Sequence, residues 1–444
     1  MTTLKVSSAI EQLNKLIEFR QIVYEDVFTE ARDVQFETID SLLLSDHPRS
    51  FAELSLSPVF GRQWSSLYDA VERGQQDQER LARLLVEQVP DQGVQVFPLD
   101  TTMWSHPHAR TLPDLVYAPS PTRALKHRSI VQGHQYSLIS WAPEAGSSWS
   151  PVVLSRRVKA SEREIEVGVE QVKQVCRYRL GAELTVITAD GIYGTHHFFA
   201  PLKQSNCALV ARLRCDRVLY GEPGVYGGRG RPRKHGDRFA FKEPDTWPEP
   251  DEVAEYEHPD WGQVRLHAWR QWHARQDADT PFHVIRAAVH QQRLKPPPPL
   301  WLAYVPAPDQ DHYPVQQVWE WFTQRWPIEP AIRFRKQHLA WTLPRLQTTD
   351  ACDRWTRLVD LAGWQLFLAR HLVQDQPLPW QKAQVALTPA RVHRSLGALF
   401  AQFDSPAQPP KTRRNSPGWP KGRPRTRPER YKPVKRGRSR ASPA

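Results

Sequence analysis

The succession of apolar patterns between residues 94 and 214 constrains the fold more than any other feature of the sequence. Three strand-like segments come first, and they are VQVFPLD at 94–100, HQYSLISWAP at 134–143 and WSPVVLSRRV at 149–158. A helical pattern at 161–180 follows, opening on a Ser-x-x-Glu cap signal. A buried strand in ELTVITADGIYG, a short helix around HHFFAPLK and a strand in NCALVARLR complete the series. This order predicts an α/β fold.

The flanking regions have different patterns. Residues 1–90 carry apolar positions at three- and four-residue spacing, which predicts a helical N-terminal domain. Residues 216–314 combine a Gly- and Arg-rich loop with strand-like segments, which predicts a β-rich insertion. Helical periodicity resumes over 315–405. We therefore divide the α/β domain into a first part at 91–215 and a second part at 315–405, followed by a tail at 406–444.

The tail carries the whole charge excess. Of the 60 Lys and Arg and the 48 Asp and Glu, 13 bases and one acid lie in residues 411–444, so this segment alone accounts for the net charge of +12. A segment rich in Pro, Arg and Lys cannot bury enough apolar surface to fold, but it can displace counterions from a polyphosphate. We predict a disordered basic tail that contacts DNA or RNA. A merely solubilising tail is the alternative.

Composition excludes other classes of protein. The chain is 40% apolar and contains 17 Trp, so it can form globular cores. No run of about 18 uncharged apolar residues occurs, and no secretory leader is evident, so we expect no membrane association and a cytoplasmic, nucleoid-associated location. The four cysteines lack C-x-x-C spacing, which favours buried thiols over a zinc ribbon or a disulfide framework.

Three acids come from three separate elements. Asp100 and Asp190 end predicted strands, and Glu329 is the one carboxylate in the basic segment FTQRWPIEPAIRFRKQHL at 322–339. Carboxylates at the C-terminal ends of strands face the crevice where α/β folds bind their ligands. If the first and fourth strands are neighbours, these acids could bind two divalent cations for phosphoryl transfer.

The segment at 322–339 also carries a resemblance. It fits the pattern Tyr-x2-Arg-x3-Glu-x6-Lys as Phe322, Arg325, Glu329 and Lys336, with three of the four positions matched. This pattern is similar to that of DDE transposases of bacterial insertion sequences, of the cut-and-paste type. The Asp–Asp–Glu order and the position of the insertion also resemble the RNase H-like catalytic domain of that family, over about residues 90–370.

The resemblance implies roles for these residues. Asp100, Asp190 and Glu329 would coordinate two Mg²⁺ ions, with Mn²⁺ as a possible substitute, and Arg325 and Lys336 would bind phosphates of a transposon end. It also implies a homodimer on paired ends and double-stranded DNA partners, which are the terminal inverted repeats and the target. The phenyl ring of Phe322 can pack or stack but cannot donate a hydrogen bond to a phosphate.

The helix that carries Glu329 depends on two prolines. A continuous helix would place Arg325, Glu329 and Lys336 on one face. Pro327 and Pro330 lack an N–H, so the backbone is expected to kink, or a new helix to begin, near Glu329.

Further candidates for DNA contacts are basic or aromatic. Two Gly-Arg-Pro motifs resemble minor-groove AT-hooks, although neutralisation of the DNA backbone is the simpler role. The basic candidates are Arg229, Arg231, Arg233, Lys234, Arg423 and Arg425. Trp104 could stack on a displaced base or belong to the core. His106 and His108 could bind a metal, but no third ligand is apparent.

These observations together indicate a DNA transposase that cleaves the 3′ strand at the element ends and joins the freed hydroxyl to target DNA. The spacing and the insertion favour the hairpin-forming branch of the family. Two alternatives stay open. One is a transposase-derived protein that binds DNA without cutting it, and the other is an RNase H-like nuclease that cuts without joining.

Overall fold

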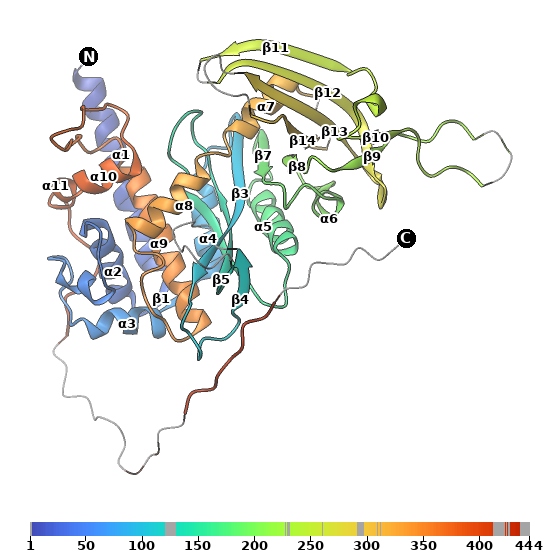
Figure 1. Cartoon of the computed structure of the whole chain (residues 1–444). Helices are drawn as coiled ribbons and strands as arrows, with labels where there is room; N and C mark the ends of the chain where they lie inside the picture. Colours follow the sequence, from blue (N-terminus) through green and yellow to red (C-terminus); the bar gives the residue numbers. More distant parts are fainter. Residues whose placement is uncertain are drawn as a thin grey trace.

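A large mixed sheet organises the molecule (Figure 1). The computed structural model describes residues 2–119, 130–226, 228, 231–259, 261–290, 297–308, 310, 312–411, 422, 424 and 427–435. Arg229, Arg423 and Arg425, three of the predicted DNA contacts, lie outside these residues.

The predicted strands of residues 94–214 form the centre of this sheet. The strands are β3 (Val94–Ser105), β4 (Val116–Pro119), β5 (Ile130–Ser140), β6 (Val152–Val158), β7 (Leu184–Ala189) and β8 (Ala208–Leu213). β3 pairs antiparallel with β5, and β5 pairs antiparallel with both β4 and β6. On its other side β3 pairs in parallel with β7, which pairs in parallel with β8. The predicted meander and the adjacency of the first and fourth strands are therefore confirmed, in a mixed α/β sheet consistent with an RNase H-like domain.

The predicted insertion is β-rich and continues the same sheet. Its strands are β9 (Val218–Tyr220), β10 (Arg238–Ala240), β11 (Glu252–His258), β12 (Gly262–Ala274), β13 (Asp277–His290) and β14 (Leu300–Val305), with a 3-10 turn η4 at Pro244–Thr246. β14 pairs antiparallel with β8, so the insertion extends the central sheet beyond its last parallel strand. Figure 1 shows these strands, in yellow and green, at the upper side of the molecule.

The central parallel strand β7 is buried along its whole length because helices cover both faces of the sheet. Successive residues alternate between two clusters: Ile187 of β7 packs in the cluster that includes α5 (Glu164–Tyr178), and Val186 in the cluster that includes α7 (Val315–Thr323). Between β7 and β8 lie the short helix α6 (His196–Phe199) and a 3-10 turn η3 (Ala200–Leu202). Both predicted helices of this region are confirmed.

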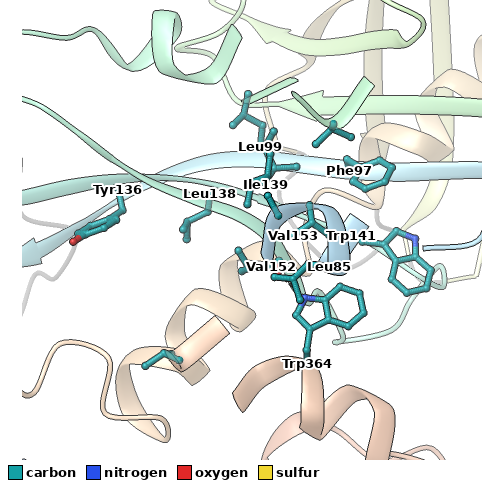
Figure 2. Close-up of a cluster of buried hydrophobic side chains, with 14 of the residues drawn as sticks. Leu85, Phe97, Leu99, Tyr136, Leu138, Ile139, Trp141, Val152, Val153 and Trp364 are labelled. Carbon is teal, nitrogen blue, oxygen red and sulfur yellow. Dashed lines mark hydrogen bonds between the residues drawn. The ribbon is translucent and has the colours of Figure 1, made fainter. Parts of the chain in front are cut away.

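A long buried helix, α9 (Thr349–Ala369), packs against the antiparallel side of the sheet. Its Trp364 stacks on Trp141 with ring centroids 6.3 Å apart and donates a hydrogen bond to the carbonyl of Val152. Figure 2 shows this cluster, in which side chains of β3, β5 and β6 meet Leu85 and Trp364. The sheet and α9 therefore share one core.

The N-terminal residues are largely helical, as predicted. Their elements are α1 (Thr2–Ile22), the π-helix η1 (Val23–Val27), β1 (Phe28–Glu30), α2 (Arg32–Leu44), the 3-10 helix η2 (Ala52–Leu56), α3 (Ser65–Glu72), β2 (Gln75–Gln76) and α4 (Gln78–Glu87). α1, α2 and α3 pack on α9, and their apolar side chains belong to the same cluster as those of the sheet. The helices thus share a core with the α/β domain, and the domain boundary at residue 90 stays a prediction.

The chain ends with α8 (Ile328–Gln337) before α9, and α10 (Pro389–Ser395) and α11 (Gly397–Phe400) after it. In the basic tail, the N–H of Val434 donates to Leu115 and its carbonyl accepts from Tyr117, beside the edge strand β4, whose free backbone groups can pair in this way. The disorder of residues 406–444 stays a prediction.

Two composition-based predictions can also be compared with the structure. Cys176, Cys207 and Cys352 are buried as predicted, but Cys215 is exposed. Among the described residues, no helix is both long enough and apolar enough to cross a bilayer.

Candidate functional site

Asp100 and Asp190 lie side by side because β3 and β7 are parallel neighbours. The register of this pair ends at Leu99 opposite Ala189, and each aspartate is the next residue of its chain. At this point β7 ends, whereas β3 continues to Ser105 through its pairing with β5. The prediction that a strand ends at Asp100 is therefore wrong, but the loss of the parallel partner still opens the sheet there.

The loop after Asp190 is held close to β8. A Cβ atom on Gly194 would lie 2.2 Å from the carbonyl oxygen of Arg212, so only glycine allows this approach. Arg212 in turn places its Nη1 atom 3.9 Å from an oxygen of Asp190. The second acid thus has a guanidinium group from the next strand beside it.

The helical region that carries Glu329 is broken at the prolines, as predicted. α7 ends at Thr323, a turn covers residues 324–327, and α8 begins at Ile328 with Pro327 as its N-cap. Glu329 therefore lies in the first turn of α8, where a negative charge is favourable. Arg325 lies in the turn, so a single helical face does not describe this site.

Arg325 joins the first acid to the third. Its Nη1 donates to Asp100 at 3.2 Å and its Nη2 donates to Glu329 at 2.9 Å. The N–H of Thr101 also donates to Asp100, at 2.7 Å. Burial raises the pKa of Asp100 above its usual value, Arg325 lowers it, and the charges of Asp190 and Glu329 raise it. Asp190 and Glu329 thus both act electrostatically on Asp100.

Comparison with known proteins agrees with this arrangement. A family model described as "DDE superfamily endonuclease" matches residues 23–277, which is more than half of the chain. The chain belongs to this family. The matched region includes Asp100 and Asp190 and ends in the insertion, before Glu329. Proteins of this family are nucleases of the DDE class, which act on DNA and typically depend on a divalent metal.

The other comparisons add little. No curated protein matches the sequence. Among solved structures, the C-terminal lobe of a budding yeast Argonaute is similar with 9% identity and a TM-score of 0.22, covering 75% of this chain and 62% of that one. The chain therefore spans less than two thirds of that structure, and at this TM-score the likeness carries no implication for the DDE endonuclease.

The donor set of this DDE endonuclease suits a hard divalent cation. Three carboxylates offer the oxygen ligands that Mg²⁺ and Mn²⁺ prefer. They already gather positive charge, since Arg325 bridges Asp100 and Glu329 and Arg212 lies beside Asp190. Their oxygens do not form one of the described groups in which three ligand atoms all lie within 4.8 Å of one another. In this structure the three acids therefore lie beside the guanidinium groups of Arg325 and Arg212.

Lys336 connects α8 to β3. Its Nζ donates to the hydroxyl of Thr102 at 2.7 Å and to the carbonyl of Met103 at 2.9 Å. Burial, followed by the charge of Arg335, lowers the pKa of Lys336 to about 8. The ammonium group thus holds the helix that carries Glu329 against the strand that carries Asp100.

Two predicted DNA contacts are wrong. Trp104 is completely buried, with its ring beside those of His106, Tyr136 and Trp341, so no base can stack on it. Phe322 is only 8% exposed and stacks on Trp319, so it belongs to the core under α7. Both aromatic side chains belong to the hydrophobic core. They lie on faces of a strand and a helix that other elements cover, so they are removed from solvent.

A groove adjoins Asp190. It has a volume of about 540 Å³ and lies between the end of β8 and the insertion. Its lining includes three basic residues, Arg212, Arg214 and Lys242, and two acids, Asp190 and Asp216. No local pattern selects the three basic residues, because they come from two segments that meet only when the insertion extends the sheet. The predicted basic residues Arg231, Arg233 and Lys234 are exposed in the insertion loop.

Proposed function

We propose that this DDE endonuclease is a DNA transposase. It would cleave the 3′ strand at transposon ends and join the freed 3′-hydroxyl to target DNA. The observation that carries the proposal is that Arg325 bridges Asp100 and Glu329, while Asp190 directly follows the strand that pairs in parallel with β3. In the first step a water oxygen attacks the phosphorus and the 3′-oxygen leaves. In the second step that 3′-hydroxyl loses its proton and attacks a target phosphodiester, and the 3′-oxygen of the target strand leaves.

The metal that fits these acids is Mg²⁺, with Mn²⁺ as a substitute. Asp100, Asp190 and Glu329 would hold two ions. Such a pair of hard cations stabilises the attacking and leaving oxygens of an in-line displacement. The chain itself supplies carboxylates whose mutual repulsion raises the pKa of Asp100, and this repulsion is relieved when positive charge binds between them.

Positive side chains around the acids would position the DNA strand. Arg212, Arg214 and Lys242 line the groove beside Asp190, so a strand lying there would place its phosphates next to that acid. Arg325 would be a further phosphate ligand, since its side chain is 14% exposed at the acid cluster. Lys336 would act through position, because its donors already bind Thr102 and Met103.

The remaining basic residues would bind DNA farther from the acids. Arg231, Arg233, Lys234 and the tail would neutralise flanking or target phosphates without reading sequence. We also propose that the protein acts as a homodimer on paired ends, that a hairpin forms during cleavage, and that it works in the cytoplasm on nucleoid DNA. The homodimer follows from the resemblance to insertion-sequence transposases, and the hairpin from the spacing at 322–339 together with the insertion. The location is the expectation from the composition.

The test is cleavage by the purified Asp190→Asn variant. The substrate is a supercoiled plasmid that carries the repeats flanking the gene, incubated with Mg²⁺. We expect Asp190→Asn to bind the ends as the wild type does and to lose nicking, because the amide cannot supply the charge. Asp245→Asn, an exposed acid of the insertion, is the matched control and should cut normally.

Three outcomes would contradict the proposal. Undiminished nicking by Asp190→Asn would exclude the role of this acid. Wild-type protein that binds the ends without nicking them would be a DNA-binding relative. Wild-type protein that nicks but yields no joined product would be a nuclease.

A further inference from the structure

A second group of possible metal ligands lies on the other side of β3 from its parallel partner. His106 follows β3, His134 lies on β5, and Cys352 lies in the first turn of α9. Each offers a ligand atom, and these three atoms all lie within 4.8 Å of one another. All three residues are buried. The partners of His106 in this group, His134 and Cys352, therefore come from two segments that are distant in the sequence.

The hydrogen bond of His134 fixes which nitrogen is available. Its Nε2 lies 2.9 Å from the carbonyl oxygen of Pro113. A carbonyl oxygen only accepts, so Nε2 carries the proton and Nδ1 has the free lone pair. Nδ1 is buried and has no hydrogen-bond partner within the described chain. A carbonyl behind one imidazole nitrogen is the usual support for a metal on the other.

His106 also has a ring nitrogen without a hydrogen-bond partner among the described residues. His106 is only 8% exposed, and this nitrogen is its buried Nε2. Buried polar atoms are normally paired, and two unpaired imidazole nitrogens beside one thiol are therefore unusual.

We propose that His106, His134 and Cys352 bind one zinc ion that fastens the β3–β5 pair to α9. Two imidazoles and a thiolate are ligand types of protein zinc sites, whereas Mg²⁺ requires oxygen. On binding, the thiol of Cys352 loses its proton to solvent and the sulfur forms the bond to zinc. The site is separate from the three acids and does not depend on the proposed function.

The experiment measures metal content in the full-length, tag-free chain. The protein is produced with added zinc, dialysed against EDTA to remove loosely held ions, and analysed by mass spectrometry for metals. We expect about one zinc ion per chain, held by these three side chains. Cys352→Ser and His134→Gln should lose it. Cys207→Ser, a buried thiol elsewhere, and Cys215→Ser, an exposed one, should keep it.

A second measurement does not depend on how the variants fold. Zinc in the wild-type protein is replaced by Co²⁺, and the absorption spectrum is recorded. We expect the thiolate-to-cobalt charge-transfer band, which zinc but not Mg²⁺ should abolish. Wild-type protein with neither zinc nor this band would overturn the proposal. So would ligand variants that retain zinc at the wild-type level.

Discussion

Burial of Lys336 lowers the stability of the folded protein, while its hydrogen bonds hold α8 against β3. Its pKa falls from 10.5 to about 8 on folding, because the ammonium is buried and lies near Arg335. The unfolded chain therefore binds a proton that the folded chain releases between these values, so stability should rise with pH across this window. Below about pH 8 the charged lysine opposes folding in full. A shift of this size corresponds to about 3 kcal/mol, at about 1.4 kcal/mol per pKa unit.

Lys336→Met should therefore stabilise the protein. Methionine fills a similar volume without a charge, but the hydroxyl of Thr102 and the carbonyl of Met103 lose their donor, which costs about 1 kcal/mol each. We expect a net gain of about 1 kcal/mol at pH 7, decreasing towards pH 10 as the wild-type lysine becomes neutral. Urea denaturation followed by tryptophan fluorescence at pH 7 and pH 9.5 measures both quantities. The same variant should cleave DNA poorly, because α8 is then less firmly held against β3.

The matched control is Lys173→Met on α5, whose side chain is exposed, and this change should alter neither stability nor its pH dependence. A Lys336→Met protein that is less stable than the wild type at pH 7 would refute the reasoning. Equal pH dependence in the wild type and the variant would refute it as well, since the proton release would then not come from Lys336.

Two further predictions concern charge. Arg325→Gln should raise the pKa of Asp100 and shift the acid limb of the cleavage pH profile to higher pH, because Arg325 is the group that lowers this pKa; Arg333→Gln, exposed on α8, is the control, and an unshifted limb would exclude the effect. Removal of residues 411–444 should lower the affinity for all DNA sequences alike and flatten the salt dependence measured by titration, since phosphate contacts carry little sequence information. An unchanged salt slope would contradict the second prediction.

The adjacency of the two aspartates was predictable because it depends on strand order. Apolar runs at 94–100 and 183–189 each precede an aspartate, and parallel pairing of those strands brings the next residues together. The course of β3 beyond Asp100 was not predictable, because its pairing with β5 decides it. The prolines at 327 and 330 did predict the break before Glu329, since the missing N–H is a local property.

The burial of Trp104 and Phe322 depends on packing against other segments, which no local sequence pattern encodes. Trp104 follows Asp100 on the same strand, so its distance to the acids was foreseeable. Its burial results from Trp341 and Tyr136, which come from other segments. Phe322 stands where the transposase pattern has a tyrosine, but its ring stacks on Trp319 of the same helix, α7, and is buried. An aromatic residue in a nucleic-acid enzyme is thus assigned to core or surface only after its neighbours are known.

The proposed zinc ligands mark the limit of motif reading. Zinc motifs are recognised when two ligands lie two to five residues apart, because a turn can then bring both to one ion. Here the three ligands come from three separate segments, and the pairing of β3 with β5 and the packing of α9 on the sheet bring them together. The only local pair, His106 and His108, does not reappear in the cluster, where His134 supplies the second imidazole. Unpaired lone pairs in a buried core are therefore the evidence for such a site, and they exist only in three dimensions.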